Sequence, residues 1–233
     1  MTNQSLDRGR DVPDYENYDY RAEWIDRSIE DSVEKELILS LLGRRGHCLE
    51  LGGGFGRVTS FLEPHFENMV MVDYSSSSLH RASARLQKAD LLRSDIRTLP
   101  FIEGTFDSAI AIRVLHHVKD LRPLIGELVR VCRDGSNVVF AVPNSRFGIY
   151  GGVARNQKVI VGRWNHVAYV HSLEDYSRPG LALLEIRGSG ILDNRVGRRL
   201  KRFPRLSKID IATSRAWFLK PELFLKYRVE KRK

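Results

Sequence analysis

Residues 48–57 of this 233-residue chain read CLELGGGFGR: an apolar run, one carboxylate, then four glycines within five positions around a single Phe. The run that precedes the glycines is too short and too apolar for a surface helix, so it predicts a buried strand over 47–51. Glycine adopts positive φ and lets bare main chain approach a ligand, and a helix that starts here offers free N–H groups. The stretch therefore predicts a parallel sheet with a nucleotide site at its edge.

The same alternation of apolar runs and helical patterns recurs along the chain. Helices are expected at 21–42, from 75 to about 88 and at about 121–132, with a short one ending near Pro64. The strands expected to alternate with them lie at 47–51, 68–75, 89–95, 106–114 and 137–144. Five strands that alternate with helices indicate an α/β fold with a doubly wound, Rossmann-like parallel sheet.

The rhythm breaks after Pro143. Residues 144–172 hold glycines, aromatic residues and histidines without clear periodicity, which indicates an insertion over the working edge of the sheet. Two more strands are expected at 181–188 and 215–229. Because proline cannot donate to a strand ladder, Pro221 implies that the last strand contains a bulge or lies at an edge.

Composition sets broad limits on the class of protein. A hydrophobic fraction of 42% and a charged fraction of 29% are typical of a soluble globular chain. The apolar runs are too short for a spanning helix, and the first 35 residues lack the apolar core of a secretory signal, so a cytoplasmic location is expected. Cys48 and Cys132 lie in apolar segments without metal-ligand spacing, which predicts buried reduced thiols and no metal site.

The net charge of +9 is unevenly placed. Residues 187–233 hold 15 Lys/Arg against 4 Asp/Glu, so they carry +11 and the preceding part carries −2. Three interpretations of the basic region stay open. It can be an ordinary solvated surface; the stretch 197–208 can contact an anionic lipid surface, since Leu200, Phe203 and Leu206 interleave its charges; or the region can contact nucleic acid, although no appended RNA-binding module is present.

The order of the glycines distinguishes two classes of nucleotide site. Arg57 stands where the dinucleotide fingerprint GxGxxG has its third glycine, so a pyrophosphate fits poorly. ELGGGFG, with Glu50 two residues before the first glycine, instead resembles the signature loop of class I S-adenosylmethionine-dependent methyltransferases. FDSAIAIRVLHHV (106–118) and ELVRVCRDGSNVVFAVPN (127–144) are similar to the later landmarks of that family, in the right order. The closest group is type 11, which includes quinone-biosynthesis enzymes.

The resemblance implies a seven-stranded sheet with the last strand antiparallel, and S-adenosyl-L-methionine as the cofactor. Asp73, at the end of the second strand, is expected to accept both ribose hydroxyls. Asp95 would lie next to the adenine amino group with Ile96 packed on the ring, and Glu50 would hold N–H groups of the loop. The residues expected to bind the cofactor are Glu50, Gly52, Gly53, Gly54, Gly56, Asp73, Tyr74, Asp95, Ile96 and Arg113.

Catalytic and substrate-binding residues are less clearly marked. His116 and His117 are an adjacent ionisable pair near the expected methyl site, where an imidazole can take a proton from the nucleophile. The alternative is that the LHH turn only packs the helix that follows it. By resemblance, His166 and Tyr169 in WNHVAYVHS (164–172) reach the acceptor, unless they are packing residues of a lid.

These observations give one domain with three parts. Residues 1–46 form a segment and helix that cover the cofactor, and tyrosines of DYENYDY (14–20) either fold over it or belong to an unstructured acidic tail. Residues 47–144 form the cofactor-binding core, and 145–233 supply the substrate-side insertion, the final hairpin and the basic tail.

The expected function is direct methyl transfer from S-adenosylmethionine to a small-molecule or lipid-like acceptor. Such a transfer depends mainly on alignment of nucleophile, methyl carbon and sulfur. Two alternatives remain: an RNA methyltransferase that uses the basic region, and a non-catalytic protein that binds the cofactor or a partner.

Overall fold

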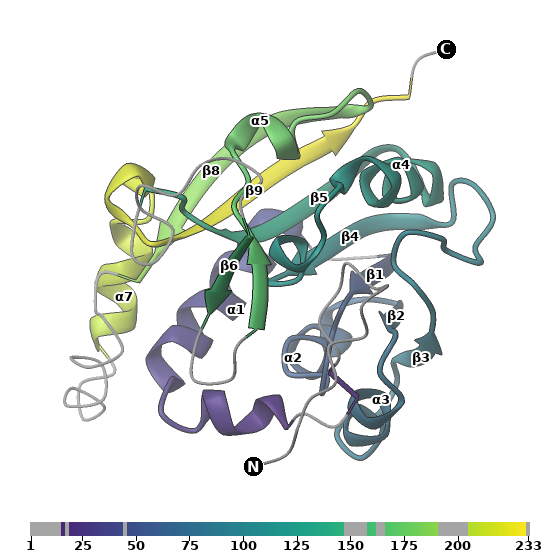
Figure 1. Cartoon of the computed structure of the whole chain (residues 1–233), viewed down its shortest axis with the longest axis horizontal. Helices are drawn as coiled ribbons and strands as arrows, with labels where there is room; N and C mark the ends of the chain where they lie inside the picture. Colours follow the sequence, from purple (N-terminus) through teal and green to yellow (C-terminus); the bar gives the residue numbers. More distant parts are fainter. Residues whose placement is uncertain are drawn as a thin grey trace.

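The computed structural model describes residues 15–16, 19–43, 46–146, 158–161, 166–190 and 205–231 (Figure 1). Side chains at 158–161, 166–167 and 205–206 are not among the described features. Tyr18 and most of the basic stretch 197–208 lie outside the described residues.

The centre of the molecule is a seven-stranded sheet. Its strands, in spatial order, are β3 (Asp90–Arg93), β2 (Asn68–Asp73), β1 (His47–Leu51), β4 (Phe106–Ile112), β5 (Cys132–Pro143), β9 (Glu222–Val229) and β8 (Leu181–Ser189). The first five are parallel, whereas β9 runs antiparallel to both β5 and β8. The expected α/β, doubly wound sheet with an antiparallel last strand is confirmed.

Helices cover both faces of this sheet (Figure 1). The helical elements are η1 (Tyr20–Trp24), α1 (Ser28–Leu42), α2 (Thr59–Leu62), η2 (Glu63–His65), α3 (Ser76–Ser83), η3 (Leu115–His117), α4 (Leu121–Val131), α5 (Leu173–Tyr176), α7 (Arg205–Ala212) and η5 (Trp217–Leu219). A separate antiparallel hairpin joins β6 (Lys158–Val161) to β7 (His166–Tyr169).

The inner strand β5 separates two layers of the core. Val138, Phe140 and Val142 belong to the cluster that includes α4, while Val139 and Ala141 belong to the cluster that includes α1 and α2. Successive side chains of a strand point to opposite faces, so a strand covered on both sides reads as a continuous apolar run. This explains why NVVFAV shows no alternation of polar and apolar residues.

Three expectations about individual elements were wrong. The predicted helix at 21–42 is interrupted after Trp24, and Ile25, expected on the apolar face, is 75% exposed. The predicted strand at 215–229 begins only at Glu222, because residues 217–219 form a 3₁₀ turn. Pro221 therefore precedes the strand, and β9 is an internal strand; the irregularity lies in its pairing with β8, between Leu183 and Glu185.

The insertion holds regular structure that its sequence did not reveal. Two four-residue strands, β6 and β7, pair within 144–172. Strands this short carry too few residues to establish a period of two. No helix in the described parts of the chain is long and apolar enough to cross a membrane.

Candidate cofactor and active site

The glycine loop follows β1 and brings bare backbone close to β2. A Cβ atom at Gly53 would overlap the side chain of Met71, which is buried in β2. Gly54 has φ +58° and a Cβ there would meet no atom within 4 Å. The loop therefore needs glycine at one position for close packing and leaves open space above the next one.

Asp73, the last residue of β2, fixes the loop from the neighbouring strand. Its Oδ2 accepts from the Gly54 N–H at 2.9 Å, and its Oδ1 accepts from the Ser75 N–H at 2.9 Å. Burial raises the pKa of Asp73, and the hydrogen bonds from the Ser75, Gly54 and Tyr74 backbones act in the opposite direction. Each carboxylate oxygen can accept a second hydrogen bond, so a ligand hydroxyl can bind here without displacing the loop.

A cavity of about 560 Å³ opens beside the loop and Asp73. Ten of the residues predicted from sequence line it: Glu50, Gly52, Gly53, Gly54, Asp73, Tyr74, Asp95, Ile96, Arg113 and His117. The volume is in the range of sites for drug-sized ligands and nucleotides. The structure thus brings the carboxyl ends of β1, β2, β3 and β4 to one hollow, as expected for a parallel sheet.

Two of the residues predicted to bind the cofactor or to act in catalysis do not line this cavity. Gly56 instead lies against Ala82 and Leu86, which a Cβ at this position would approach to 3.3 Å. His116 lies behind His117, with the two ring centroids 4.0 Å apart. Gly56 serves close packing of the loop on the α3 region, and His116 has no place on the cavity wall.

Glu50 occupies a buried position under the loop. It is 2% exposed, and its Oε2 accepts from the Thr59 hydroxyl. The expectation that Glu50 holds N–H groups of the loop is therefore wrong for this structure. Burial raises the pKa of Glu50 to about 7, although the Thr59 hydroxyl and the Arg57 charge oppose the shift. A cation bound nearby would favour the ionised form of this carboxyl at neutral pH.

Asp95 lies on a more exposed part of the cavity wall. Its carboxylate receives the Arg97 side chain, with the Arg97 Nη2 to Asp95 Oδ2 distance at 2.6 Å, and it also accepts from the Arg97 N–H at 2.8 Å. The Arg97 hydrogen bonds lower the pKa of Asp95. An adenine amino group would share this carboxylate with a guanidinium.

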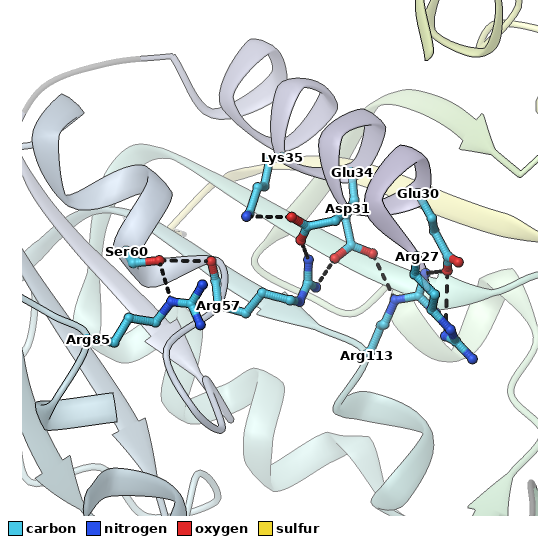
Figure 2. Close-up of polar contacts among 9 residues, drawn as sticks. All are labelled: Arg27, Glu30, Asp31, Glu34, Lys35, Arg57, Ser60, Arg85 and Arg113. Atoms are coloured by element: carbon cyan, nitrogen blue, oxygen red, sulfur yellow. Dashed lines mark hydrogen bonds and ion pairs between the residues drawn. The ribbon is translucent and has the colours of Figure 1, made fainter. Parts of the chain in front are cut away.

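A buried ion-pair network joins the loop to α1 (Figure 2). Glu34 is fully buried in α1 and receives two guanidinium groups, from Arg57 after the glycine loop and from Arg113 after β4. The Arg113 Nε to Glu34 Oε2 distance is 2.8 Å, and Arg57 also pairs with Asp31. Burial would raise the pKa of Glu34, but the two arginines outweigh it and lower the pKa to about 2.

Arg113 is held in an uncommon backbone conformation at the end of β4. Its φ of +56° is rare for a residue with a side chain. Besides Glu34, its guanidinium reaches Glu30 at 2.6 Å and Glu222 at 3.4 Å. Arg113 was predicted to bind the cofactor; it lines the cavity, but these carboxylates hold its charged end.

The Trp24 ring completes the network from the N-terminal side. The Arg57 guanidinium carbon lies 3.4 Å from the centre of this ring, close enough for a cation–π contact. No local pattern in the sequence indicates that Glu34, Arg57 and Trp24 meet, and from the sequence Arg57 could equally be a surface residue. The only local hint is that three acids, Glu30, Asp31 and Glu34, lie close together on an amphipathic helix, which could have indicated a site for cations.

The N-terminal segment lies across the same cavity. The Tyr15 N–H donates to the Tyr74 hydroxyl at 2.6 Å, and the Tyr15 hydroxyl lies 2.8 Å from His117 Nε2. Glu16 accepts from the Ser76 N–H at the start of α3, at 2.9 Å. Tyr15 and Tyr20 both line the cavity, so the structure places two tyrosines of DYENYDY there.

The two predicted substrate contacts lie in the hairpin. Tyr169, in β7, is buried and is not among the residues that line the cavity. The backbone of His166 begins β7, and its side chain is outside the described features. Of the two predicted substrate contacts, Tyr169 is therefore the one with a described side chain, and it is absent from the cavity wall.

We predict that Glu34→Gln lowers the free energy of unfolding at neutral pH by about 3–5 kcal/mol, because it leaves two buried guanidinium groups without full compensation. Since its folded-state pKa is about 2 against an ordinary 4.5, the Glu34 carboxylate contributes stability that is fully present above the ordinary value and is lost as pH falls toward 2. Denaturant titration of both proteins at neutral and acid pH measures the difference. Glu36→Gln, outside the network, is the control; an equal loss at all pH values would contradict the assignment.

Comparison with known proteins agrees with this geometry. Residues 49–140 match the type 11 family model described as "Methyltransferase domain". Phosphatidylethanolamine N-methyltransferase of Cereibacter sphaeroides is 28% identical over 117 residues, which are 48% of this chain and 57% of that protein. Nodulation protein S of Rhizobium tropici is 28% identical over 138 residues, 56% of this chain and 52% of its own. The chain spans little more than half the length of these relatives.

The fold is shared with solved structures. The N-methyltransferase NodS from Bradyrhizobium japonicum WM9, in complex with S-adenosyl-L-homocysteine, superposes with a TM-score of 0.62 over 90% of this chain and 91% of that one. At 19% identity this likeness shows the fold alone. Residues 49–140 therefore match a methyltransferase domain, and the fold around them is that of solved S-adenosylmethionine-dependent methyltransferases.

Proposed function

We propose that the cavity beside the glycine loop binds S-adenosylmethionine and that the chain transfers its methyl group to a small-molecule or lipid-like acceptor. The observation that carries the proposal is the pairing of open main chain at Gly54 with the buried carboxylate of Asp73 across one hollow. A nucleoside needs a surface free of side chains and an acceptor for two adjacent hydroxyls. The residues present supply both.

The residues divide into three groups by what they offer. Asp73 would hold the ribose, and Asp95 with Ile96 would face the base. Gly52, Gly53 and Gly54, with Glu50 beneath them, would support the end of the cofactor that carries positive charge. Tyr74 ties the N-terminal segment to the cavity wall through Tyr15.

When bound, the cofactor supplies an electrophilic methyl carbon on a positively charged sulfur. The chain's own contribution is to hold the reactants in line and to exclude water. Tyr15, Tyr20 and Phe55 supply aromatic wall on the cavity, and the network around Glu34 fixes the elements on which that wall stands. Positioning of this kind is separate from removal of a proton from the acceptor, which is a second contribution.

His117 is the better of the two histidine candidates for moving a proton. It lines the cavity, and its Nε2 lies 2.8 Å from the Tyr15 hydroxyl, whereas His116 is absent from the wall. To accept a proton at Nε2, His117 would have to release its hydrogen bond with the Tyr15 hydroxyl and form one with the O–H or N–H group of the methyl acceptor. The lipid-like acceptor class draws support from the relative named phosphatidylethanolamine N-methyltransferase.

The direct test is incubation with methyl-labelled S-adenosylmethionine and separated lipid, small-metabolite and RNA fractions. We expect label in the lipid or small-metabolite fraction. His117→Gln should slow the transfer while cofactor affinity is retained. Label confined to RNA would replace the proposed acceptor class, and no label in any fraction would favour the non-catalytic alternative.

We predict that Asp73→Ala weakens binding of S-adenosylmethionine by about 1–3 kcal/mol, from roughly fivefold to more than a hundredfold in Kd, because charge-assisted hydrogen bonds are lost. Asp95→Ala should cost less, since its carboxylate is 44% exposed and already shared with Arg97. Isothermal calorimetry measures both, with thermal melts to verify folding. Equal affinities in Asp73→Ala and the unaltered protein would mean that the ribose lies elsewhere.

We predict that binding of the cofactor releases a proton from Glu50. Its pKa is raised to about 7, so the carboxyl is partly protonated at neutral pH, and a cationic ligand would lower that pKa and expel the proton. About half a proton should be released at neutral pH, and affinity should rise as pH rises through this range. Calorimetry in buffers of different ionisation enthalpy measures the release, which Glu50→Gln should abolish. A buffer-independent enthalpy in the unaltered protein would refute the linkage.

A further inference from the structure

Residues 205–221 precede β9 and consist of α7, a turn and η5; we call them the α7–η5 segment. A buried lysine anchors it: Lys220 is 1% exposed, and its Nζ lies 2.5 Å from Asp210 Oδ1 and 2.9 Å from Thr213 Oγ1. Asp210 also accepts from the Gly190 N–H at the end of β8, at 2.8 Å. The segment is therefore fixed to the sheet by its own interior polar groups.

The outer surface of the α7–η5 segment combines apolar and basic side chains. Ile209 is 54% exposed, Phe218 52% and Leu219 63%, and Lys208 and Arg215 are exposed beside them in sequence. Asp210 is the segment's only acid, and it is buried against Lys220. Large exposed apolar side chains among cations, with no exposed acid, are the composition of a surface that meets an anionic bilayer.

The position of the segment relates this surface to the cavity. Two residues separate the end of η5 from Glu222, which begins β9 and pairs with Pro143 at the carboxyl end of β5. Glu222 in turn lies 3.4 Å from Arg113, a residue of the cavity wall. On the other side α7 packs against α1, as Figure 1 shows at the left of the molecule. The segment thus flanks the sheet edge that carries the cavity.

We propose that the α7–η5 segment docks the protein on the surface of an anionic lipid bilayer, with Phe218 and Leu219 entering the interface and Lys208 and Arg215 facing the headgroups. Charge complementarity argues for this occupant, since the surface of an anionic bilayer attracts cations and also takes up large apolar side chains that lie among them. An RNA would engage the cations and gain less from Ile209 and Leu219. The proposal stands on these side chains and does not require that the methyl acceptor be a lipid.

The test is co-sedimentation of the full chain with vesicles of phosphatidylcholine mixed with phosphatidylglycerol, against phosphatidylcholine alone. We expect binding to the anionic vesicles only. The double variant Phe218→Ser/Leu219→Ser should weaken that binding at least about tenfold, because it removes the apolar groups that would be buried in the bilayer interface. Lys208→Gln/Arg215→Gln should weaken it as well and reduce its dependence on salt.

The matched control is Ile102→Ser, which removes an 81% exposed apolar side chain from the β3–β4 connection. Calorimetric binding of S-adenosylmethionine, unchanged in every variant, separates failure of this proposal from failure of the proposed function. Absence of binding to anionic vesicles would overturn the docking site, as would an equal loss in Ile102→Ser. Binding that survives Phe218→Ser/Leu219→Ser and is displaced by RNA would identify a nucleic-acid surface instead.

Discussion

The site depends on one buried carboxylate that holds two arginines. Glu34, in the interior of α1, pairs with Arg57 from the glycine loop and with Arg113 from the end of β4. The cost of burying the three charges is offset only while all of them are in place, because a lone buried ion is strongly destabilising. This requirement fixes α1, the loop and β4 relative to one another, and the cavity is the space that they leave.

Asp73 has a comparable double role on the opposite wall. Its two oxygens hold the Gly54 and Ser75 N–H groups, so the acceptor proposed for the ribose also sets the loop beneath it. A group that shapes the empty site and meets the ligand needs little rearrangement on binding. Such preorganisation reduces the entropy that binding must otherwise overcome.

The proposed lipid-facing surface is also held in place by buried polar groups. Lys220 and Asp210 are sequestered inside the α7–η5 segment, which leaves its outer face with cations and apolar groups. Two cations of the charge surplus of residues 187–233, Lys208 and Arg215, therefore lie on this outer face, in the segment that leads into β9. Methyl transfer and membrane docking would then share one edge of the sheet.

Local sequence determined the five parallel strands, the glycine loop and the carboxylates at or near the ends of β1, β2 and β3, because each apolar run, the glycine cluster and each strand end lie within a few neighbouring residues. It failed where the outcome depends on distant partners. The helical pattern breaks after Trp24, where the Trp24 ring contacts the Arg57 guanidinium. Residues 215–221 form turns rather than a strand, and here Lys220 forms a buried ion pair with Asp210. Only the tertiary structure decided that Glu34 would be a buried anchor rather than a solvated acid, since its two arginines come from segments 23 and 79 residues away. A charge can be buried only where its partners arrive, and no local pattern records their arrival.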